Sequence, residues 1–351
     1  MIQERLKALR AEMEKRGITV YVVPTADFHE SEYVGDHFKA RKFITGFTGS
    51  AGTAVITLDE AGLWTDGRYF VQAENQLKDS TVTLYRMGEE GVPTVDEFVK
   101  DRLKEGGCLG FDGRVVNGTW GGKLEKIAAE KKVSMHVTED LIDLIWEDRP
   151  ALSKQPLFIL EEKYSGKSTA DKIGDLRKAM KENGADVHIL TSLYDIAWLL
   201  NIRGNDIDYV PVVLSYLVLN ETECIWFLQE EVVDDKIRAY LEENHITTKP
   251  YDAIYDYVPE IPADAVVLMN RGTVNYRIVN SLDKAIKVVD KPNPTELMKA
   301  VKNKTEVDNT RAAHVKDGVA FTKFMYWLKT NIGKIPMTEI SASDYLEARR
   351  R

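Results

Sequence analysis

The pattern of hydrophobic and polar residues along this chain contains a helical segment followed by a strand, and this helix–strand pattern occurs twice. In the segment LRAEMEKRGITVYVV, which starts at Leu9, apolar residues recur at helical spacing before a glycine and a short apolar run. The segment LRKAMKENGADVHIL, which starts at Leu176, repeats this order, so that Gly17 and Gly184 lie 167 residues apart in equivalent places. Glycine after a helical pattern is typical of a helix end, and the apolar run favours a strand. The repeat predicts two copies of one α/β unit, each opening with a helix and a strand.

A second pair of stretches supports this repeat. Residues 55–64, VITLDEAGLW, and residues 218–226, VLNETECIW, each place two β-rich runs around a polar turn. Such a pattern predicts a β-hairpin. The predicted fold class is therefore α/β, with one hairpin in each copy.

Two proline-containing stretches mark candidate linkers, at residues 148–156 and 290–294. A residue that precedes proline is kept out of the helical region, which favours a linker at both places. The predicted domains are residues 1–150, 151–292 and 293–351.

The last of these segments is predicted to be helical. Residues 312–329 carry an apolar stripe, which is typical of a helix with one buried face; its members are Val315, Val319, Phe324, Trp327 and Leu328. A second helix is expected over residues 338–350, because Thr338 and Glu339 provide helix-start chemistry. The natural partner of the stripe is the third domain; without it, the stripe is expected to be buried by self-association, to fold back on residues 151–292, or to be mobile.

The composition and charge of the chain argue against some classes of binding partner. The chain has 44% hydrophobic and 29% charged residues, which is ordinary for a globular protein. Its net charge of -9 argues against a basic nucleic-acid-binding surface. No apolar run approaches the ~20 residues of a membrane span, and residues 1–17 form a charged pattern unlike a signal peptide. With only two distant cysteines, these features favour a cytoplasmic protein that binds neither nucleic acid nor a membrane.

Residues 64–70, WTDGRYF, carry the sharpest candidate for chemistry. The segment reads as a strand end, a tight Asp-Gly turn and the start of a helix, which places Arg68 on a loop. A guanidinium is a planar, permanently charged donor that suits a carboxylate or a peptide carbonyl. Two interpretations stay open: Arg68 contacts a ligand, or it pairs with Asp66 or Glu74 or lies over a neighbouring aromatic ring as a surface residue.

Two other loops invite a functional interpretation and are assigned structural roles. In DFHESEY, residues 27–33, the three residues His29, Glu30 and Glu32 could suggest a metal site, but no fourth ligand lies nearby in sequence. A loop with a solvated acidic face and one hydrogen-bonded histidine is favoured. FTGSAGTAV, residues 47–55, lacks the GxxxxGK[ST] spacing of a phosphate-binding loop. A strand-entry turn with glycines at close backbone approaches is favoured there.

The counterpart segment of the second copy is IRGNDIDYVPVVLSY, residues 202–216. Here Arg203 and Asp206 are predicted to form an ion pair that holds a loop, with turn residues Gly204 and Pro211 around it. Tyr216 is a candidate for the interface between domains.

Together these motifs resemble the three-domain cytosolic Xaa-Pro aminopeptidases, or aminopeptidases P, over nearly the whole chain. The resemblance is carried, in the family's order, by DFHESEY, FTGSAGTAVIT, WTDGRYF, LIDLIWEDRP, YDIAWLLNIRGND, KAVKNKTEVDNTRAAHVKDGVA and TEISASDYLE. It implies two tandem creatinase-type N-terminal domains, each a mixed sheet flanked by helices, and then the helical start of a truncated pita-bread catalytic domain. It also implies a homodimeric enzyme that uses two divalent metal ions, usually manganese, to remove the first residue from peptides with proline second.

The resemblance assigns one site residue. In the resembled enzymes an arginine at the place of Arg68 reaches the substrate cleft, so Arg68 is expected to bind substrate. The family's metal ligands begin with a D-x-G…D-x-T-R pattern that does not occur in residues 341–351. No catalytic residue and no metal ligand is therefore assigned, and residues 1–351 alone are expected to be inactive.

Two alternative classes of protein stay open: a non-catalytic binding or oligomerisation module, and a creatinase or prolidase. The doubled unit and the TEISA segment favour aminopeptidase P over both.

Overall fold

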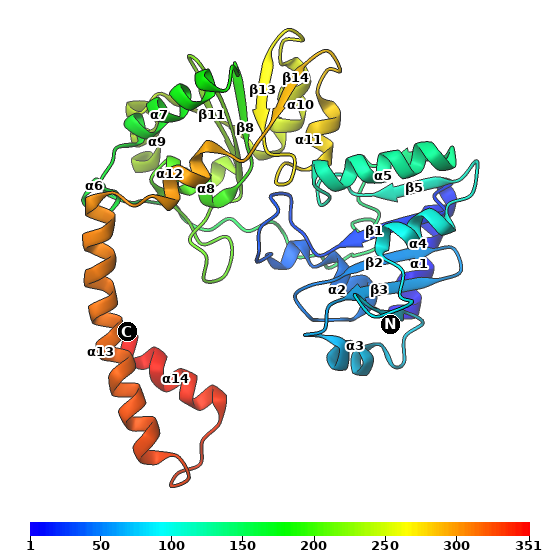
Figure 1. The fold of residues 1–351 in the computed structure, drawn as a ribbon, viewed down its shortest axis with the longest axis horizontal. Coiled ribbons are helices and arrows are strands. Elements are labelled where there is room, and N and C mark those ends of the chain that lie inside the picture. Colours follow the sequence, from blue (N-terminus) through cyan, green and yellow to red (C-terminus); the bar gives the residue numbers. More distant parts are fainter.

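The computed structural model describes all residues from 1 to 351, and it contains two α/β units built to one plan (Figure 1). The sheet of the first unit consists of β1 (Val20–Pro24), β2 (Thr53–Thr57), β3 (Ala61–Thr65), β4 (Thr83–Arg86), β5 (Cys108–Phe111) and β6 (Ser134–His136). The sheet of the second unit consists of β8 (Val187–Leu190), β10 (Ser215–Asn220), β11 (Cys224–Leu228), β12 (Ile246–Pro250), β13 (Val266–Met269) and β14 (Lys287–Asp290). A small third sheet pairs β7 (Phe158–Ile159) with β9 (Ile202–Arg203).

The two large sheets have the same topology, because their strand orders are β4-β3-β2-β1-β5-β6 and β12-β11-β10-β8-β13-β14. In each unit the first strand pairs antiparallel with one strand of the hairpin and parallel with a crossover strand. The hairpins β2–β3 and β10–β11 are antiparallel, as predicted. These are mixed sheets flanked by helices, so the predicted α/β class is confirmed.

The helices follow the same repeat. The first unit contains α1 (Ile2–Lys15), α2 (Ala40–Thr45), α3 (Phe70–Leu77), α4 (Val95–Arg102) and α5 (Gly118–Lys131), and the second contains α6 (Glu162–Ser165), α7 (Thr169–Glu182), α8 (Leu193–Leu199), α9 (Asp235–Glu243), α10 (Ile254–Tyr257) and α11 (Tyr276–Ser281). Helices α1 and α7 start 167 residues apart, as do strands β1 and β8. Gly17 and Gly184 follow these helices with φ of 67° and 63°, a left-handed conformation that favours glycine. The predicted helix–strand repeat is thus confirmed.

The units meet through equivalent helices. Helix α5 lies between β5 and β6 and helix α11 between β13 and β14, and the two helices pack against each other (Figure 1). Their N-terminal residues Asn117 and Asn275 form an antiparallel bridge. The backbone N–H of Gly118 donates to Val274 at 2.8 Å, and that of Tyr276 donates to Val116 at 2.7 Å. This reciprocal pairing gives the junction between the units an approximate two-fold arrangement.

Helix α12 (Pro294–Ala300) packs on the second unit, although the sequence places residue 293 onward in a third domain. Asn293 and Thr295 are buried. The Lys299 ammonium lies 2.7 Å from a carboxylate oxygen of Asp195 in α8, and the Asp195 side chain is 0% exposed. The boundary at residue 293 stays a prediction, and this packing favours a boundary after α12.

The chain continues into the long helix α13 (Lys304–Asn331) and returns as α14 (Glu339–Arg350), away from both sheets (Figure 1). The predicted helices at 312–329 and 338–350 lie within or along these two. Trp327 of the apolar stripe stacks on Tyr345 of α14, with ring centres 3.9 Å apart, whereas Val315 and Val319 are exposed. One end of the stripe is therefore covered by α14, an alternative that the sequence analysis did not consider. None of the helices combines the length and hydropathy that a membrane span requires.

Candidate functional site

Arg68 lies on the loop after β3, and its side chain is 69% exposed. The Asp66 carboxylate accepts hydrogen bonds from Arg68 Nε at 2.8 Å and from Nη2 at 2.9 Å. This pairing lowers the pKa of Asp66 to about 2, so both groups are charged at neutral pH. The Nη1 group of Arg68 donates to no protein atom, and it leaves two N–H donors for a ligand. The local ion pair and the ligand contact are thus compatible with each other.

Tyr69 connects this arginine to the glycine-rich loop 46–52. The guanidinium of Arg68 lies over the Tyr69 ring, 5.1 Å from its centre, and the Tyr69 hydroxyl is 2.6 Å from the Ser50 hydroxyl. A Cβ atom on Gly49 would lie 2.2 Å from the Phe47 ring and 2.8 Å from the Tyr69 ring, so glycine is required there. The loop leads directly into β2, which is the strand-entry turn that the sequence predicts.

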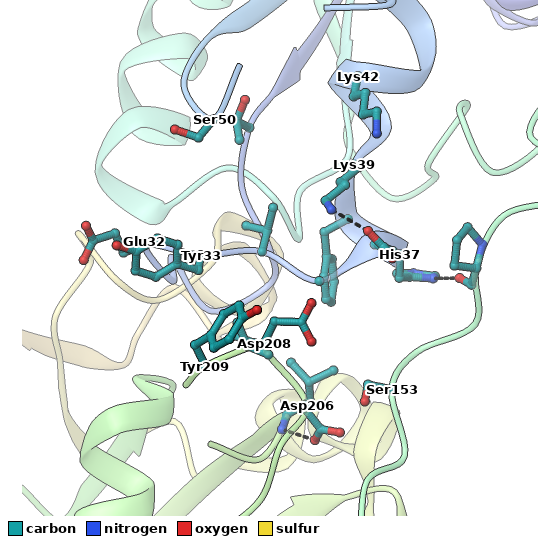
Figure 2. Close-up of a pocket in the computed structure, with 18 of the residues that line it drawn as sticks. Glu32, Tyr33, His37, Lys39, Lys42, Ser50, Ser153, Asp206, Asp208 and Tyr209 are labelled. Atoms are coloured by element: carbon teal, nitrogen blue, oxygen red, sulfur yellow. Dashed lines mark hydrogen bonds and ion pairs between the residues drawn. The ribbon is translucent and has the colours of Figure 1, made fainter. Parts of the chain in front are cut away.

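A cavity of about 780 Å³ opens beside this loop, between the two units (Figure 2). Its first-unit wall includes Arg41, Lys42 and Ser50, and its second-unit wall includes Asp208 and Tyr209. The volume falls in the range of small-ligand sites. The wall of the first unit carries both basic side chains and the carboxylates of Glu32 and Asp36, and the wall of the second contributes Asp208 and the Tyr209 ring. Arg68 does not line the cavity, and is joined to its edge through Tyr69 and Ser50.

His29 lies in the junction between the units, with 2% of its surface exposed. Its Nδ1 atom is 3.1 Å from the carbonyl oxygen of Thr191, and its Nε2 atom is 2.6 Å from the Tyr251 hydroxyl. Because a carbonyl only accepts, Nδ1 carries the proton and Nε2 accepts from the tyrosine. Burial lowers the pKa of His29 to about 4, which keeps the ring neutral at physiological pH.

The predicted hydrogen-bonded histidine is therefore found, but the predicted solvated acidic face around it is wrong in part. Asp27 is buried and accepts hydrogen bonds from the backbone N–H of His29 and Ser31. Burial raises the pKa of Glu30 to about 7, and Glu30 accepts a hydrogen bond from Asn117 at 3.0 Å. Residues 27–33 therefore form a partly buried, hydrogen-bonded loop in the junction between the two units, with a structural role.

The predicted ion pair between Arg203 and Asp206 is wrong. Arg203 donates to the carbonyl oxygens of Ala197 and Ile202. Asp206 accepts from the backbone N–H of Gln155 and Leu214. Local spacing suggested the pair, but each side chain satisfies backbone groups of a different segment. Tyr216, the candidate for the interface, does reach it: its ring centre lies 4.5 Å from that of His29.

Sequence reasoning missed a second Asp-Gly-Arg segment at the end of β5. Arg114 donates to both carboxylate oxygens of Asp112, with Nη2 at 3.0 Å from one of them. Its guanidinium lies over the Phe28 ring in the junction, 4.4 Å from the ring centre. The repeated letters DGR at 66–68 and 112–114 were the available signal.

The side chains present do not form a metal site. No group of three or more His, Cys, Asp or Glu residues comes together in a way that could hold a metal ion. His29 is committed to Thr191 and Tyr251, so it has no free ring nitrogen for a ligand bond.

Comparison with known proteins places both units in one class. The family described as "Creatinase/Prolidase N-terminal domain" matches residues 5–145, and a second family of the same description matches residues 148–306. The chain therefore carries two creatinase/prolidase N-terminal domains in tandem, in agreement with the repeated topology.

Relatives along the whole chain are more specific. The chain is 38% identical over 359 residues to the "Probable Xaa-Pro aminopeptidase P" of Sordaria macrospora, and 38% identical to that of Neurospora crassa, with 98% of this chain covered in each case. It also matches the crystal structure of the X-prolyl aminopeptidase from Caenorhabditis elegans, described as "a cytosolic enzyme with a di-nuclear active site", with a TM-score of 0.92 and 31% identity over 99% of this chain. The chain belongs to the Xaa-Pro aminopeptidase P family.

These relatives are longer than this chain. The match spans 58% of the Sordaria protein, 52% of the Neurospora protein and 59% of the nematode chain. The chain thus spans somewhat more than half the length of the proteins that it resembles.

Proposed function

We propose that this chain is the N-terminal, substrate-facing part of a metal-dependent Xaa-Pro aminopeptidase, an enzyme that removes the first residue from peptides with proline second. The observation that carries the proposal is the match to the nematode enzyme, with a TM-score of 0.92 over 99% of the chain. The two fungal relatives, named for the same activity, support it.

In this proposal the metal ions bind in the part of the relatives that this chain does not match. Two divalent ions are proposed because the nematode enzyme is described as di-nuclear, and manganese is the first ion to test. Such ions generate a hydroxide nucleophile and polarise the scissile carbonyl. The residues 1–351 offer no ligand cluster for them, so we expect no hydrolysis from this chain alone.

The part played by the chain itself is the binding of peptide by Arg68. Its free Nη1 donors and its exposure suit a carbonyl or carboxylate oxygen of the peptide. Asp66 holds the guanidinium in one orientation through two hydrogen bonds, and thereby reduces the entropy lost when the peptide binds.

The test compares this chain with a chimera in which the unmatched C-terminal part of the Sordaria relative follows residue 351. We expect the chimera to release the first residue from Ala-Pro-Ala when manganese is present, and the chain alone to release none. Arg68→Ala in the chimera should lower kcat/KM by about tenfold or more, the effect of one charge-assisted hydrogen bond, with unchanged metal content.

The Sordaria protein is the positive control. If it is active and a folded, metal-loaded chimera is not, the chain is better described as a binding or oligomerisation module. If the chimera is active and Arg68→Ala has normal kinetics, Arg68 has no role in substrate binding.

The proposal includes assembly as a cytoplasmic homodimer. Exposed apolar side chains on the last three helices support self-association; they include Leu297, Val315, Val319 and Ile340. The description of the nematode enzyme as cytosolic supports the compartment. Sedimentation equilibrium of the chimera should give twice the mass of one chain, and a monomer at micromolar concentration would contradict the homodimer.

A further inference from the structure

Four carbonyl groups of the glycine-rich loop accept hydrogen bonds from side chains of the first unit. Arg41 donates to the carbonyl oxygens of Phe47, at 2.6 Å, and of Gly49. The Thr65 hydroxyl donates to the carbonyl oxygen of Ala51 at 2.8 Å. Thr25 does the same for Gly52, also at 2.8 Å. Four side chain to backbone bonds thus fix the orientation of the peptide groups between Phe47 and Thr53.

The amide N–H groups of the second half of this loop, residues 49–52, have no partner, whereas those of Gly46, Phe47 and Thr48 donate to Lys42, Thr45 and Gln76. Those of Gly49, Ser50, Ala51 and Gly52 donate to no protein atom. In a trans peptide group the C=O and the following N–H point in opposite directions, and the chain contains no cis peptide. Because Gly49 C=O points at Arg41 and Ala51 C=O at Thr65, the N–H groups of Ser50 and Gly52 point away from the interior.

The charge behind the loop is positive and unneutralised. Arg41 is 3% exposed and forms no ion pair, since its partners are carbonyl and hydroxyl oxygens. Lys42, which lines the cavity beside Ser50 (Figure 2), forms no ion pair either. A guanidinium bound to a carbonyl oxygen polarises that peptide group, and so strengthens the N–H at its other end as a donor.

From these observations we propose that the Ser50 and Gly52 amides form a binding site for a carboxylate, namely the C-terminal carboxylate of a short peptide. Two outward amides with a buried cation behind them favour an anion over a neutral carbonyl. The Ser50 hydroxyl is 2.6 Å from the Tyr69 hydroxyl, and the guanidinium of Arg68 lies over the Tyr69 ring, so Tyr69 connects the site to the proposed peptide-binding arginine. The choice of a peptide as ligand rests on the proposed function.

Binding is measured on the chain itself, labelled with 15N-serine and 15N-glycine, by titration with Ala-Pro-Ala as free acid, with the same peptide as C-terminal amide, and with acetate. We expect the free acid to shift the Ser50 and Gly52 amide resonances, with a dissociation constant about tenfold or more below those of the amide and of acetate. Equal binding of acid and amide, equal binding of acetate, or no shift of these two resonances would each overturn the proposal.

Two variants locate the interaction. Ser50→Pro removes the amide hydrogen and the hydroxyl, whereas Ser50→Ala removes the hydroxyl alone. We expect Ser50→Ala to keep the preference for the acid, and a Ser50→Pro variant with an unchanged melting temperature to lose it. If Ser50→Pro unfolds, the Gly52 resonance of Ser50→Ala remains the readout. Because binding is read without turnover, a failure here is distinct from an absence of peptidase activity in the chimera.

Discussion

The ion pair between Lys299 and Asp195 provides a sharp test of whether α12 belongs to the second unit. The Asp195 side chain is completely buried, and Lys299 is its only cationic partner within 4.0 Å. The ammonium lies 2.7 Å from Oδ1. The second carboxylate oxygen has only a long contact of 3.5 Å with the Asn293 amide. Without the lysine, a charged carboxylate would be left almost unsatisfied in the interior.

We expect Lys299→Met to destabilise the second unit by about 3 kcal/mol, the lower end of the cost of breaking a buried pair by removing one partner. The lower end applies because the Lys299 side chain is 32% exposed and is partly solvated. Methionine keeps the packing of the aliphatic stem, so the change reports on the charge. The double variant Asp195→Asn, Lys299→Met removes both charges and should recover more than half of the loss.

Hydrogen exchange of the β8 and β10 amides measures this change, since these central strands report the unfolding free energy of their own unit. Lys304→Met is the matched control, because Lys304 pairs with Asp308 at an exposed site, where an ion pair contributes little to stability. A loss below 1 kcal/mol for Lys299→Met, or a double variant no more stable than the single one, would refute the reasoning. It would then also favour the predicted boundary at residue 293.

Three further predictions concern buried polar and ionisable side chains at the junction between the units. Burial raises the pKa of Glu30 to about 7 from 4.5. The stability that the protonated Glu30 contributes is therefore fully present below pH 4.5 and is lost as the pH rises through 7. Glu30→Gln should remove this loss of about 1–3 kcal/mol, as measured by thermal melts between about pH 4.5 and 8. His29→Phe should cost about 2 kcal/mol in urea unfolding, because the Thr191 carbonyl loses its imidazole donor and the Tyr251 hydroxyl keeps only a long contact of 3.5 Å with the Tyr216 hydroxyl. A cost near zero would contradict the junction network. Arg114→Ala should cost about 3 kcal/mol, because it leaves the buried Asp112 unpaired, whereas Arg68→Ala should leave the melting temperature unchanged within about 2 °C.

The elements of the fold that depend on local sequence could be predicted, and those that depend on distant partners could not. The helix–strand repeat was visible because Gly17 and Gly184 end equivalent helices, and the hairpins because their turns are polar. By contrast, the partner of His29 is Tyr251, 222 residues further along the chain, and no local pattern indicates it. The Arg203–Asp206 prediction failed for the same reason: proximity in sequence says nothing about which backbone groups a folded loop leaves unsatisfied.

The candidate site also shows which features local sequence determines and which depend on distant residues. The segment Asp-Gly-Arg occurs twice in the chain, and both copies adopt the same local conformation. At both places the arginine donates through Nε and Nη2 to the carboxylate two residues before it. The pairing is thus a property of the local turn, and it does not by itself indicate function. The environments differ: Arg114 is 23% exposed and lies against a ring in the junction, whereas Arg68 is 69% exposed and lies over the Tyr69 ring. A local motif therefore predicts the orientation of an arginine, and only the tertiary structure distinguishes the arginine that is exposed to solvent from the one that is packed in the junction between the units.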